Sequence, residues 1–327
     1  MNITECPGRK LGPYHFAFKR VDVEVLSSAG TPYFRGINIG MPRIHDSALD
    51  CVFYLYKTRD DAIKGTDHGG TGFFVSVPSE RFPHIGYVYA VTNKHVAIDK
   101  GFSAIRINKI DGSVDCFDTD PVQWESLANL DIAVYSAFSL NSEIHKYSHI
   151  PTSFFATDEL VLKESIGIGD DAFMIGRFIN HDGKLVNLAA ARFGNISVMP
   201  TIINYAGYAN ESYCIDLHSR PGFSGSPVFV YRLPGADFEA NEKHGRMVLE
   251  SSFLYFLGIH WGQFPEDWEI KENIVPTKYV RGVSGMTMVI PAQKILDLLN
   301  VEKLKMRRTV DDQERTIEEC FPPVILE

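Results

Sequence analysis

The sequence has few cysteines, and none of them are spaced as in a metal or redox site. Its 327 residues contain five cysteines, all far apart along the chain. Zinc ribbons and thioredoxin-like motifs need a C-x-x-C pair, which this sequence lacks. Because the number is odd as well as small, we expect free thiols in a reducing compartment and not a disulfide framework. The cysteines are Cys6, Cys51, Cys116, Cys214 and Cys320.

A long apolar run and an excess of basic residues are also missing. The best apolar run, Phe253 to Ile259, is far shorter than the roughly 20 residues of a membrane-spanning helix. The start of the chain, Met1 to Tyr14, is polar and lacks the apolar core of a signal peptide. Lys and Arg number 32 against 41 Asp and Glu, a net charge of -9. We therefore expect a cytoplasmic protein with neither nucleic acid nor membrane as a partner, and its oligomeric state stays open.

Short apolar segments separated by turn residues dominate the chain. A hydrophobic share of 45% with 22% charged residues is enough for a large buried core. The segments form two groups on either side of a crossover from about Leu140 to Ile166, which predicts two packed antiparallel β-units. The main predicted strands are Cys51 to Tyr56, Gly69 to Val77, Tyr87 to Thr92, Ala104 to Ile107, Asp131 to Tyr135, Ala172 to Gly176, Leu185 to Ala191, Asn195 to Met199, Tyr213 to Leu217, Val228 to Tyr231 and Met247 to Ile259.

Four parts of the chain follow from this pattern. Residues 1–48 form an N-terminal arm with edge strands, and residues 49–140 form the first β-unit. Residues 141–304 hold the crossover, the second β-unit with a charged surface loop at Gly235 to Arg246, and a closing helix. That helix follows Pro291, where apolar residues return at helical spacing as far as Leu304. Residues 305–327 are mainly charged and are predicted to be a tail.

One stretch, Arg220 to Val228, places a serine between glycines just before an apolar strand. Gly222 allows a sharp turn with its N–H pointing outward, and Gly225 leaves space beside the hydroxyl of Ser224. This is the pattern of a nucleophile on a tight turn. Ordinary loop chemistry gives similar sequences, so the assignment depends on the presence of a base and an acid elsewhere.

The chain supplies both in a recognisable order. His95 follows one predicted strand, Asp131 opens another, and Ser224 comes last. A serine hydroxyl needs an imidazole to take its proton, and the imidazole needs a carboxylate to fix its tautomer. Each residue alone is more often a hydrogen-bonded or turn residue, but the order His, Asp, Ser is that of the two-barrel serine peptidases.

The motifs around these residues resemble the trypsin-like serine peptidases, in particular their bacterial HtrA and glutamyl endopeptidase branch. They are Gly-Thr-Gly-Phe-Phe-Val, Val-Thr-Asn-Lys-His-Val, Leu-Asp-Ile-Ala-Val, Pro-Gly-Phe-Ser-Gly-Ser-Pro-Val and Val-Ile-Pro, between about Asp50 and Asn300. The resemblance implies two six-stranded β-barrels with the site between them. It implies His95 as general base, Asp131 as its orienting carboxylate and Ser224 as nucleophile, with an oxyanion hole from the N–H groups of Gly222 and Ser224.

A second resemblance concerns specificity. Gly-Ile-His-Trp-Gly at residues 258–262 is similar to the glutamyl endopeptidases, where the histidine binds a P1 carboxylate. It implies that His260, with Trp261 and Gly262, lines the P1 pocket, where imidazole donors can bind a carboxylate or a carboxamide. Ser219 resembles the hydroxyl residue of that pocket, and His218 beside it could add a donor. For these two residues, ordinary turn positions are an equal alternative.

We therefore expect a serine endopeptidase that hydrolyses protein or peptide substrates through an acyl-enzyme, with Glu or Gln preferred at P1. It needs no metal or organic cofactor. The alternatives are a silent or latent binding module on the peptidase fold and a broad HtrA-like quality-control peptidase. Phe223 stands where digestive relatives carry an aspartate that pairs with a new N-terminus, so activation by that pairing is not expected.

Overall fold

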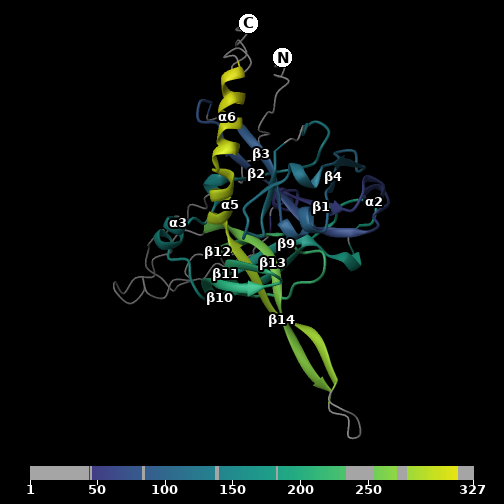
Figure 1. The fold of residues 1–327 in the computed structure, drawn as a ribbon, viewed down its shortest axis with the longest axis vertical. Helices are drawn as coiled ribbons and strands as arrows, with labels where there is room; N and C mark the ends of the chain where they lie inside the picture. Colours follow the sequence, from purple (N-terminus) through teal and green to yellow (C-terminus); the bar gives the residue numbers. More distant parts are fainter. Residues whose placement is uncertain are drawn as a thin grey trace, which may run out of the picture.

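The computed structural model describes residue 44 and residues 46–82, 85–136, 140–181, 183–232, 253–270 and 278–315. These residues form a mostly β structure with two sheets (Figure 1). The first sheet has eight strands in the order β5-β4-β1-β2-β3-β7-β6, with β8 pairing parallel to β2. Its strands are β1 Val52–Tyr56, β2 His68–Pro78, β3 Gly86–Thr92, β4 Ala104–Asn108, β5 Val114–Asp118, β6 Glu125–Ser126, β7 Ala133–Tyr135 and β8 Ile150–Pro151.

The second sheet closes into a six-stranded barrel in the order β10-β11-β14-β13-β12-β9. The hairpin of β13 and β14 continues beyond the barrel and projects away from it at the end opposite the C-terminal helices (Figure 1). The barrel strands are β9 Asp171–Arg177, β10 Ala189–Tyr205, β11 Tyr208–Asp216, β12 Pro227–Arg232, β13 Phe253–Ile270 and β14 Lys278–Pro291.

The helices are short except at the C-terminal end. None of those in the described ranges is long and apolar enough to cross a membrane. The α-helices are α1 Asp46–Leu49, α2 Arg59–Lys64, α3 Asp158–Lys163, α5 Ala292–Leu299 and α6 Glu302–Glu314. A π-helix, η1 His95–Asp99, and three 3-10 turns, η2 Pro121–Gln123, η3 Thr152–Phe154 and η4 Ile179–His181, complete the structure.

An aromatic core joins the two sheets. Phe73 of β2 lies 5.2 Å from Phe256 of β13 between ring centroids, and Phe155 of the crossover lies 4.9 Å from the same ring. All three side chains are buried. Fully burying one such side chain stabilises a fold by about 1.5–3 kcal/mol, so this contact fixes the sheets against each other.

The prediction of a mostly β protein with two sheets is confirmed, and the second sheet is a closed six-stranded barrel. The predicted closure of the first unit into a six-stranded barrel is not confirmed, because in the described residues eight strands form a sheet with β5 and β6 at its ends. Strand β5 was not predicted because two of its five residues are charged and only Cys116 among them is buried. The two strands predicted between Leu185 and Met199 are one strand, β10, which continues through shifts of register against β11.

Three predictions fall partly or wholly outside the described residues. The edge strands of the arm and the charged loop at Gly235 to Arg246 lie outside them, as do Cys6 and Cys320. The other three cysteines are free thiols, as predicted, and all are buried: Cys51, Cys116 and Cys214.

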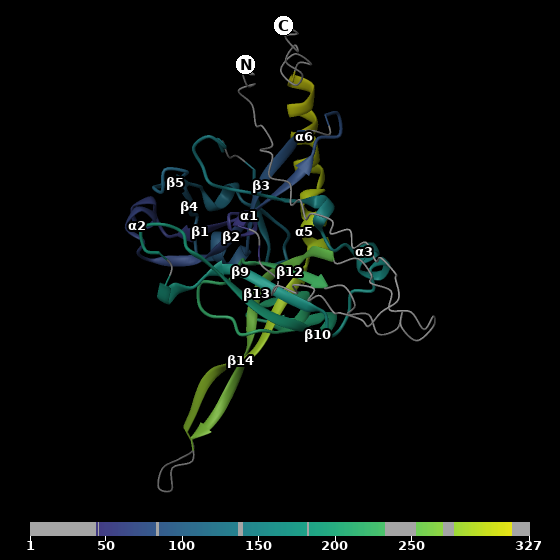
Figure 2. The ribbon, with the colours of Figure 1, turned by 180° about the vertical axis from the view of Figure 1, so that it is seen from behind.

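The predicted tail is wrong over its first ten residues, which belong to α6. Its sequence is mostly charged, but Leu304, Arg308 and Asp312, four residues apart, share one buried face. Arg308 donates to the hydroxyl of Tyr89 at 3.0 Å, and Tyr87 donates to the Asp312 carboxylate at 2.5 Å. Polar contacts thus dock α6 beside β3, on the face visible in Figure 2, so an apolar pattern could not reveal it.

Replacing Asp312 tests this docking. The carboxylate accepts from Tyr87 and, at 2.8 Å, from Ser79, so Asp312→Ala leaves two hydroxyls without their acceptor. We expect a loss of about 1–3 kcal/mol in the free energy of unfolding, measured by urea denaturation. Glu314→Ala, on an exposed position of the same helix, is the control and should change little. Equal stability of the two variants would contradict the docking.

Candidate active site

A cavity of about 550 Å³ lies between the first sheet and the barrel. It brings together residues that are far apart in the sequence, including all three members of the predicted triad. Most of the predicted specificity residues line it as well. The lining includes His95, Asp131, Ser219, Ser224, His260, Trp261 and Gly262.

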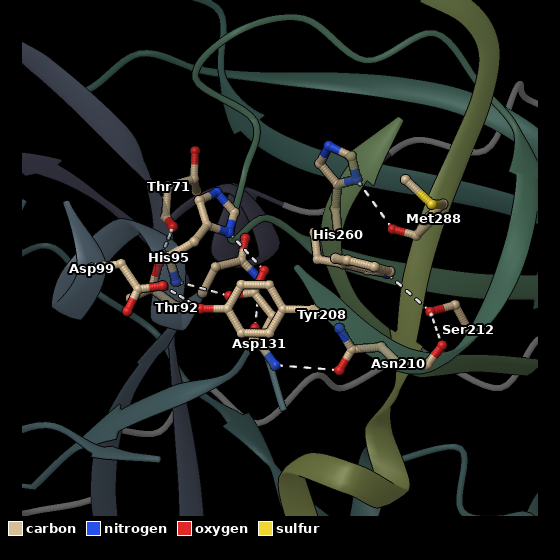
Figure 3. Close-up of polar contacts among 12 residues, drawn as sticks. Thr71, Thr92, His95, Asp99, Asp131, Tyr208, Asn210, Ser212, His260 and Met288 are labelled. Atoms are coloured by element: carbon tan, nitrogen blue, oxygen red, sulfur yellow. Dashed lines mark hydrogen bonds and ion pairs between the residues drawn. The ribbon is translucent and has the colours of Figure 1, made fainter. Parts of the chain in front are cut away.

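His95 and Asp131 make two hydrogen bonds to each other. The backbone N–H of His95 donates to one carboxylate oxygen at 2.8 Å, and ring Nδ1 lies 2.6 Å from the other (Figure 3). Nδ1 must carry the proton, because an ionised carboxylate only accepts. The imidazole therefore presents Nε2 as an acceptor toward the cavity. Asp131 is fully buried, so its charge is little screened by water.

Local structure explains how these two residues meet. Strand β3 ends at Thr92, and the chain turns at once into the π-helix η1, whose Lys100 N–H donates to the His95 carbonyl. Turns of π-helix are rare in proteins, and those that occur are often at functional sites. On the other side, Asn93 donates to the Asp131 carbonyl at 2.9 Å, and the Asp131 N–H donates to Asn210 at 3.3 Å. The residue after β3 is thus tied to Asp131, and Asp131 in turn is tied to the barrel strand β11.

The stretch before Ser224 forms a tight turn. The N–H of Phe223 donates to the Arg220 carbonyl at 3.2 Å, and Gly222 has φ of 99°. Proline followed by a residue with positive φ is the signature of a type II turn. In this turn the central peptide points opposite to its direction in a type I turn, so the Gly222 N–H is turned away from the loop. Among the described residues, neither the Gly222 nor the Ser224 N–H has an acceptor.

Thr71 of β2 holds this turn from the first sheet. Its hydroxyl donates to the Gly222 carbonyl at 2.8 Å and accepts from the Arg177 N–H at 3.0 Å. Its own N–H donates to the Ser224 carbonyl at 2.8 Å, and its carbonyl accepts the Thr92 hydroxyl at 2.7 Å. One residue therefore links β2, β3, β9 and the nucleophile turn.

The turn is also fixed from below. Phe223 is fully buried within the barrel core. Hydrophobic packing therefore anchors this position, at which no ion pair with a new N-terminus is expected. Gly225 has φ of 85°, and a Cβ there would lie 2.0 Å from the Thr71 carbonyl oxygen, so only glycine fits. Its N–H donates to the His260 carbonyl at 2.9 Å. The nucleophile turn and the predicted specificity strand are thus directly connected.

His260 is buried in this strand with both ring nitrogens in contact. Nδ1 lies 3.3 Å from the Met288 carbonyl, and Nε2 lies 2.8 Å from the Ser219 hydroxyl (Figure 3 shows the first contact). A carbonyl only accepts, so Nδ1 carries the proton and Nε2 accepts from Ser219. Burial lowers the pKa of His260 to about 4, and the imidazole is neutral at neutral pH.

The other predicted pocket residues behave differently from one another. Trp261 and Gly262 line the cavity, and the indole N–H of Trp261 donates to Ser212 at 2.9 Å. His218 is not among the cavity-lining residues. Its ring lies against Gly285 of β14, within 2.9 Å of where a Cβ at that glycine would be. It is therefore placed apart from His260 and Ser219.

Tyr208 and Asp99 are among the cavity-lining residues that the sequence does not predict. Tyr208, at the tip of the β10–β11 hairpin, donates its hydroxyl to the Asp99 carboxylate on η1, in front of the His95 and Asp131 pair (Figure 3). Burial and this hydrogen bond raise the pKa of the Tyr208 phenol. The two residues are 109 positions apart, and neither belongs to a local motif. No group of His, Cys, Asp or Glu in the described ranges could hold a metal ion.

Comparison with known protein families finds no match, and comparison with curated proteins finds no relative. Among solved structures, the apo MamO protease domain from Magnetospirillum magneticum is 12% identical with a TM-score of 0.46, covering 78% of this chain and 98% of that one. Deg5 is 15% identical with a TM-score of 0.43, covering 79% and 92%. The HtrA-type protease AlgW with a tripeptide is 17% identical with a TM-score of 0.43, covering 78% and 61%. At this similarity they assign no role to any residue here.

Thr71 is the residue whose replacement should loosen the turn most selectively. Thr71→Val keeps the side-chain shape but leaves the Gly222 carbonyl and the Arg177 N–H without their partner. We expect a loss of about 1–3 kcal/mol in the free energy of unfolding and faster hydrogen exchange at Phe223 to Gly225. Thr71→Ser retains the hydroxyl and should keep most of the stability. If valine and serine variants exchange alike, the hydroxyl does not hold the turn.

Proposed function

We propose that this chain is a serine endopeptidase in which Ser224 is the nucleophile, His95 the general base and Asp131 the carboxylate that orients it. The observation that carries the proposal is the doubly hydrogen-bonded pair of His95 and Asp131 facing a cavity that also contains Ser224. A buried carboxylate that fixes one imidazole tautomer beside a serine on a tight turn is an arrangement suited to acyl transfer.

The proposed reaction has two steps. His95 Nε2 takes the proton of the Ser224 hydroxyl as its oxygen attacks the scissile carbonyl carbon, and Asp131 stabilises the resulting imidazolium. The imidazolium then protonates the leaving amine, which leaves an acyl-enzyme on Ser224. In the second step His95 activates a water that attacks the ester, and the proton returns to the serine. The described contacts include no hydrogen bond between His95 and the Ser224 hydroxyl, and the proposal has this bond form when substrate binds.

The proposed oxyanion hole consists of the backbone N–H groups of Gly222 and Ser224. The type II turn directs the Gly222 N–H away from the loop, and the described residues give neither N–H an acceptor. Donors that are already in place when negative charge develops on the carbonyl oxygen stabilise the transition state without reorganisation. The turn is held by Thr71 and Phe223, which makes such placement rigid.

We further propose Gln or Glu at P1, bound by His260 and Ser219 at the base of the cavity. Nε2 of the neutral imidazole is an acceptor, and the Ser219 hydroxyl is both donor and acceptor. A glutamine side chain matches this pair, because its NH₂ can donate to Nε2 while its carbonyl accepts from the hydroxyl. A glutamate carboxylate has no proton to donate, so it fits only when His260 takes up a proton.

Loss of the nucleophile gives the direct test. Ser224→Ala should abolish cleavage of a protein substrate while circular dichroism and thermal unfolding stay close to those of the parent, since one half-buried hydroxyl is removed. The matched control is Ser226→Ala, in which a hydroxyl outside the cavity lining is removed from the same loop; it should still cleave. Cleavage at the parental rate by Ser224→Ala would refute the mechanism.

The P1 preference should depend on pH. Protonation of His260 is costly well above its pKa of about 4 and becomes easier as the pH falls, so cleavage after Glu gains relative to cleavage after Gln in acid. With peptides that differ only at P1, we expect the Gln/Glu ratio of kcat/KM to be about tenfold near pH 8 and to fall toward about pH 5. An effect of pH on the catalytic steps that both peptides share cancels in this ratio.

His260→Ala is the control for this measurement. It removes the titrating group, so the ratio should be small and independent of pH. A parental ratio that does not change with pH, or that favours Glu near pH 8, would contradict the pairing of a neutral imidazole with a carboxamide.

A further inference from the structure

Two arginines lie beside the nucleophile turn, and neither has a counter-charge among the described residues. Arg220 is exposed and lines the cavity one residue before Pro221. Arg192 extends from β10 with its guanidinium carbon 5.4 Å from the ring centroid of Phe223 and 5.6 Å from that of Phe178. The first ring belongs to the residue directly before Ser224. Both cations therefore border the same short segment.

Their electrostatic surroundings are unusual for arginine. Arg192 is partly buried on aromatic rings, and burial, followed by the charge of Arg220, lowers the pKa of Arg192. Within the described residues, no carboxylate forms an ion pair or hydrogen bond with either guanidinium. The acidic residues that line the cavity are already engaged: Asp131 with His95 and Asp99 with Tyr208. Two neighbouring like charges without an anion form an arrangement that binding of an anion would relieve.

We infer that Arg220 and Arg192 form a subsite for the carboxylate of an Asp or Glu side chain in the substrate, in a residue flanking P1. Guanidinium groups match carboxylates in geometry and hydrogen-bonding capacity. His260 in the same cavity is neutral and already paired with Ser219, so it does not supply this positive charge. Lys100 also lines the cavity, but it lacks the planar guanidinium that matches a carboxylate. This inference rests on the proposed peptidase function, and it adds a second determinant of specificity, separate from the P1 pocket.

The subsite also has a consequence for recognition by the whole protein. The chain carries a net charge of -9, which repels acidic peptides at long range. Arg220 in the cavity lining and Arg192 against the ring of Phe223 reverse that repulsion locally, beside the nucleophile turn. Substrates are then selected for an acidic residue close to the cleavage site, and the selection weakens as salt screens the charges.

The test compares peptides in which one position at a time on either side of a constant P1 residue carries Asp or Glu, or the uncharged Asn or Gln. We expect the parent to favour the acid at one flanking position or more by about fivefold in kcat/KM at low salt, the size of a good exposed ion pair. Arg220→Ala and Arg192→Ala should each reduce this preference, and Arg220→Glu should reverse it toward Lys. Arg59→Ala, an exposed arginine on α2, is the charge-matched control and should keep the parental profile.

A binding arm separates this inference from the proposed function. Fluorescence anisotropy of the same labelled peptides with the Ser224→Ala protein measures recognition without hydrolysis. The acidic peptides should bind more tightly than their amides, and the difference should shrink on adding Arg220→Ala. If the parent cleaves nothing but this difference is present, the peptidase proposal fails and the subsite stands. If the parent cleaves, and neither cleavage nor binding distinguishes acid from amide, the subsite is refuted.

Discussion

Every feature of the site depends on the contact between Thr71 and the turn that carries Ser224. The base and its carboxylate belong to the first sheet, whereas the nucleophile and the P1 residues belong to the barrel, so the two sheets must meet in a fixed register. Three hydrogen bonds at Thr71 hold that register at the backbone of Gly222, Ser224 and Arg177. The aromatic contact around Phe256 supplies most of the cohesion between the sheets, but it is the directional bonds that position the turn.

Burial and neighbouring groups together decide which side chains of the site are charged. Asp131 is fully buried and retains its strength as a partner for His95, since little water screens it. His260 is equally buried but has only neutral partners, which keeps it uncharged. Positive charge lies beside the nucleophile turn, on Arg220 in the cavity lining and on Arg192 against the ring of Phe223. The same site therefore contains two imidazoles with different roles, because their neighbours differ. His95 serves as a base, and His260 forms hydrogen bonds as a neutral group.

The parts of this site that could be predicted from sequence are those set by local constraints. His95, Asp131 and Ser224 each adjoin a strand end or a glycine turn, and a short motif is enough to reveal such positions. Tyr208 and Asp99 meet only because the β10–β11 hairpin reaches across to η1, and no local pattern records that pairing. Helix α6 could not be predicted for another reason. Its docking depends on buried polar groups, and a search for apolar periodicity does not detect them.

The central claim is that Ser224 is an activated nucleophile. Labelling of the folded protein with a fluorophosphonate, followed by mass spectrometry of its peptides, measures this directly because the reagent captures a serine only when base and oxyanion hole act together. The account predicts one adduct per chain, on Ser224, which disappears in the His95→Ala protein. Folded protein that carries no adduct on Ser224, or an adduct whose rate of formation is the same without His95, would contradict it.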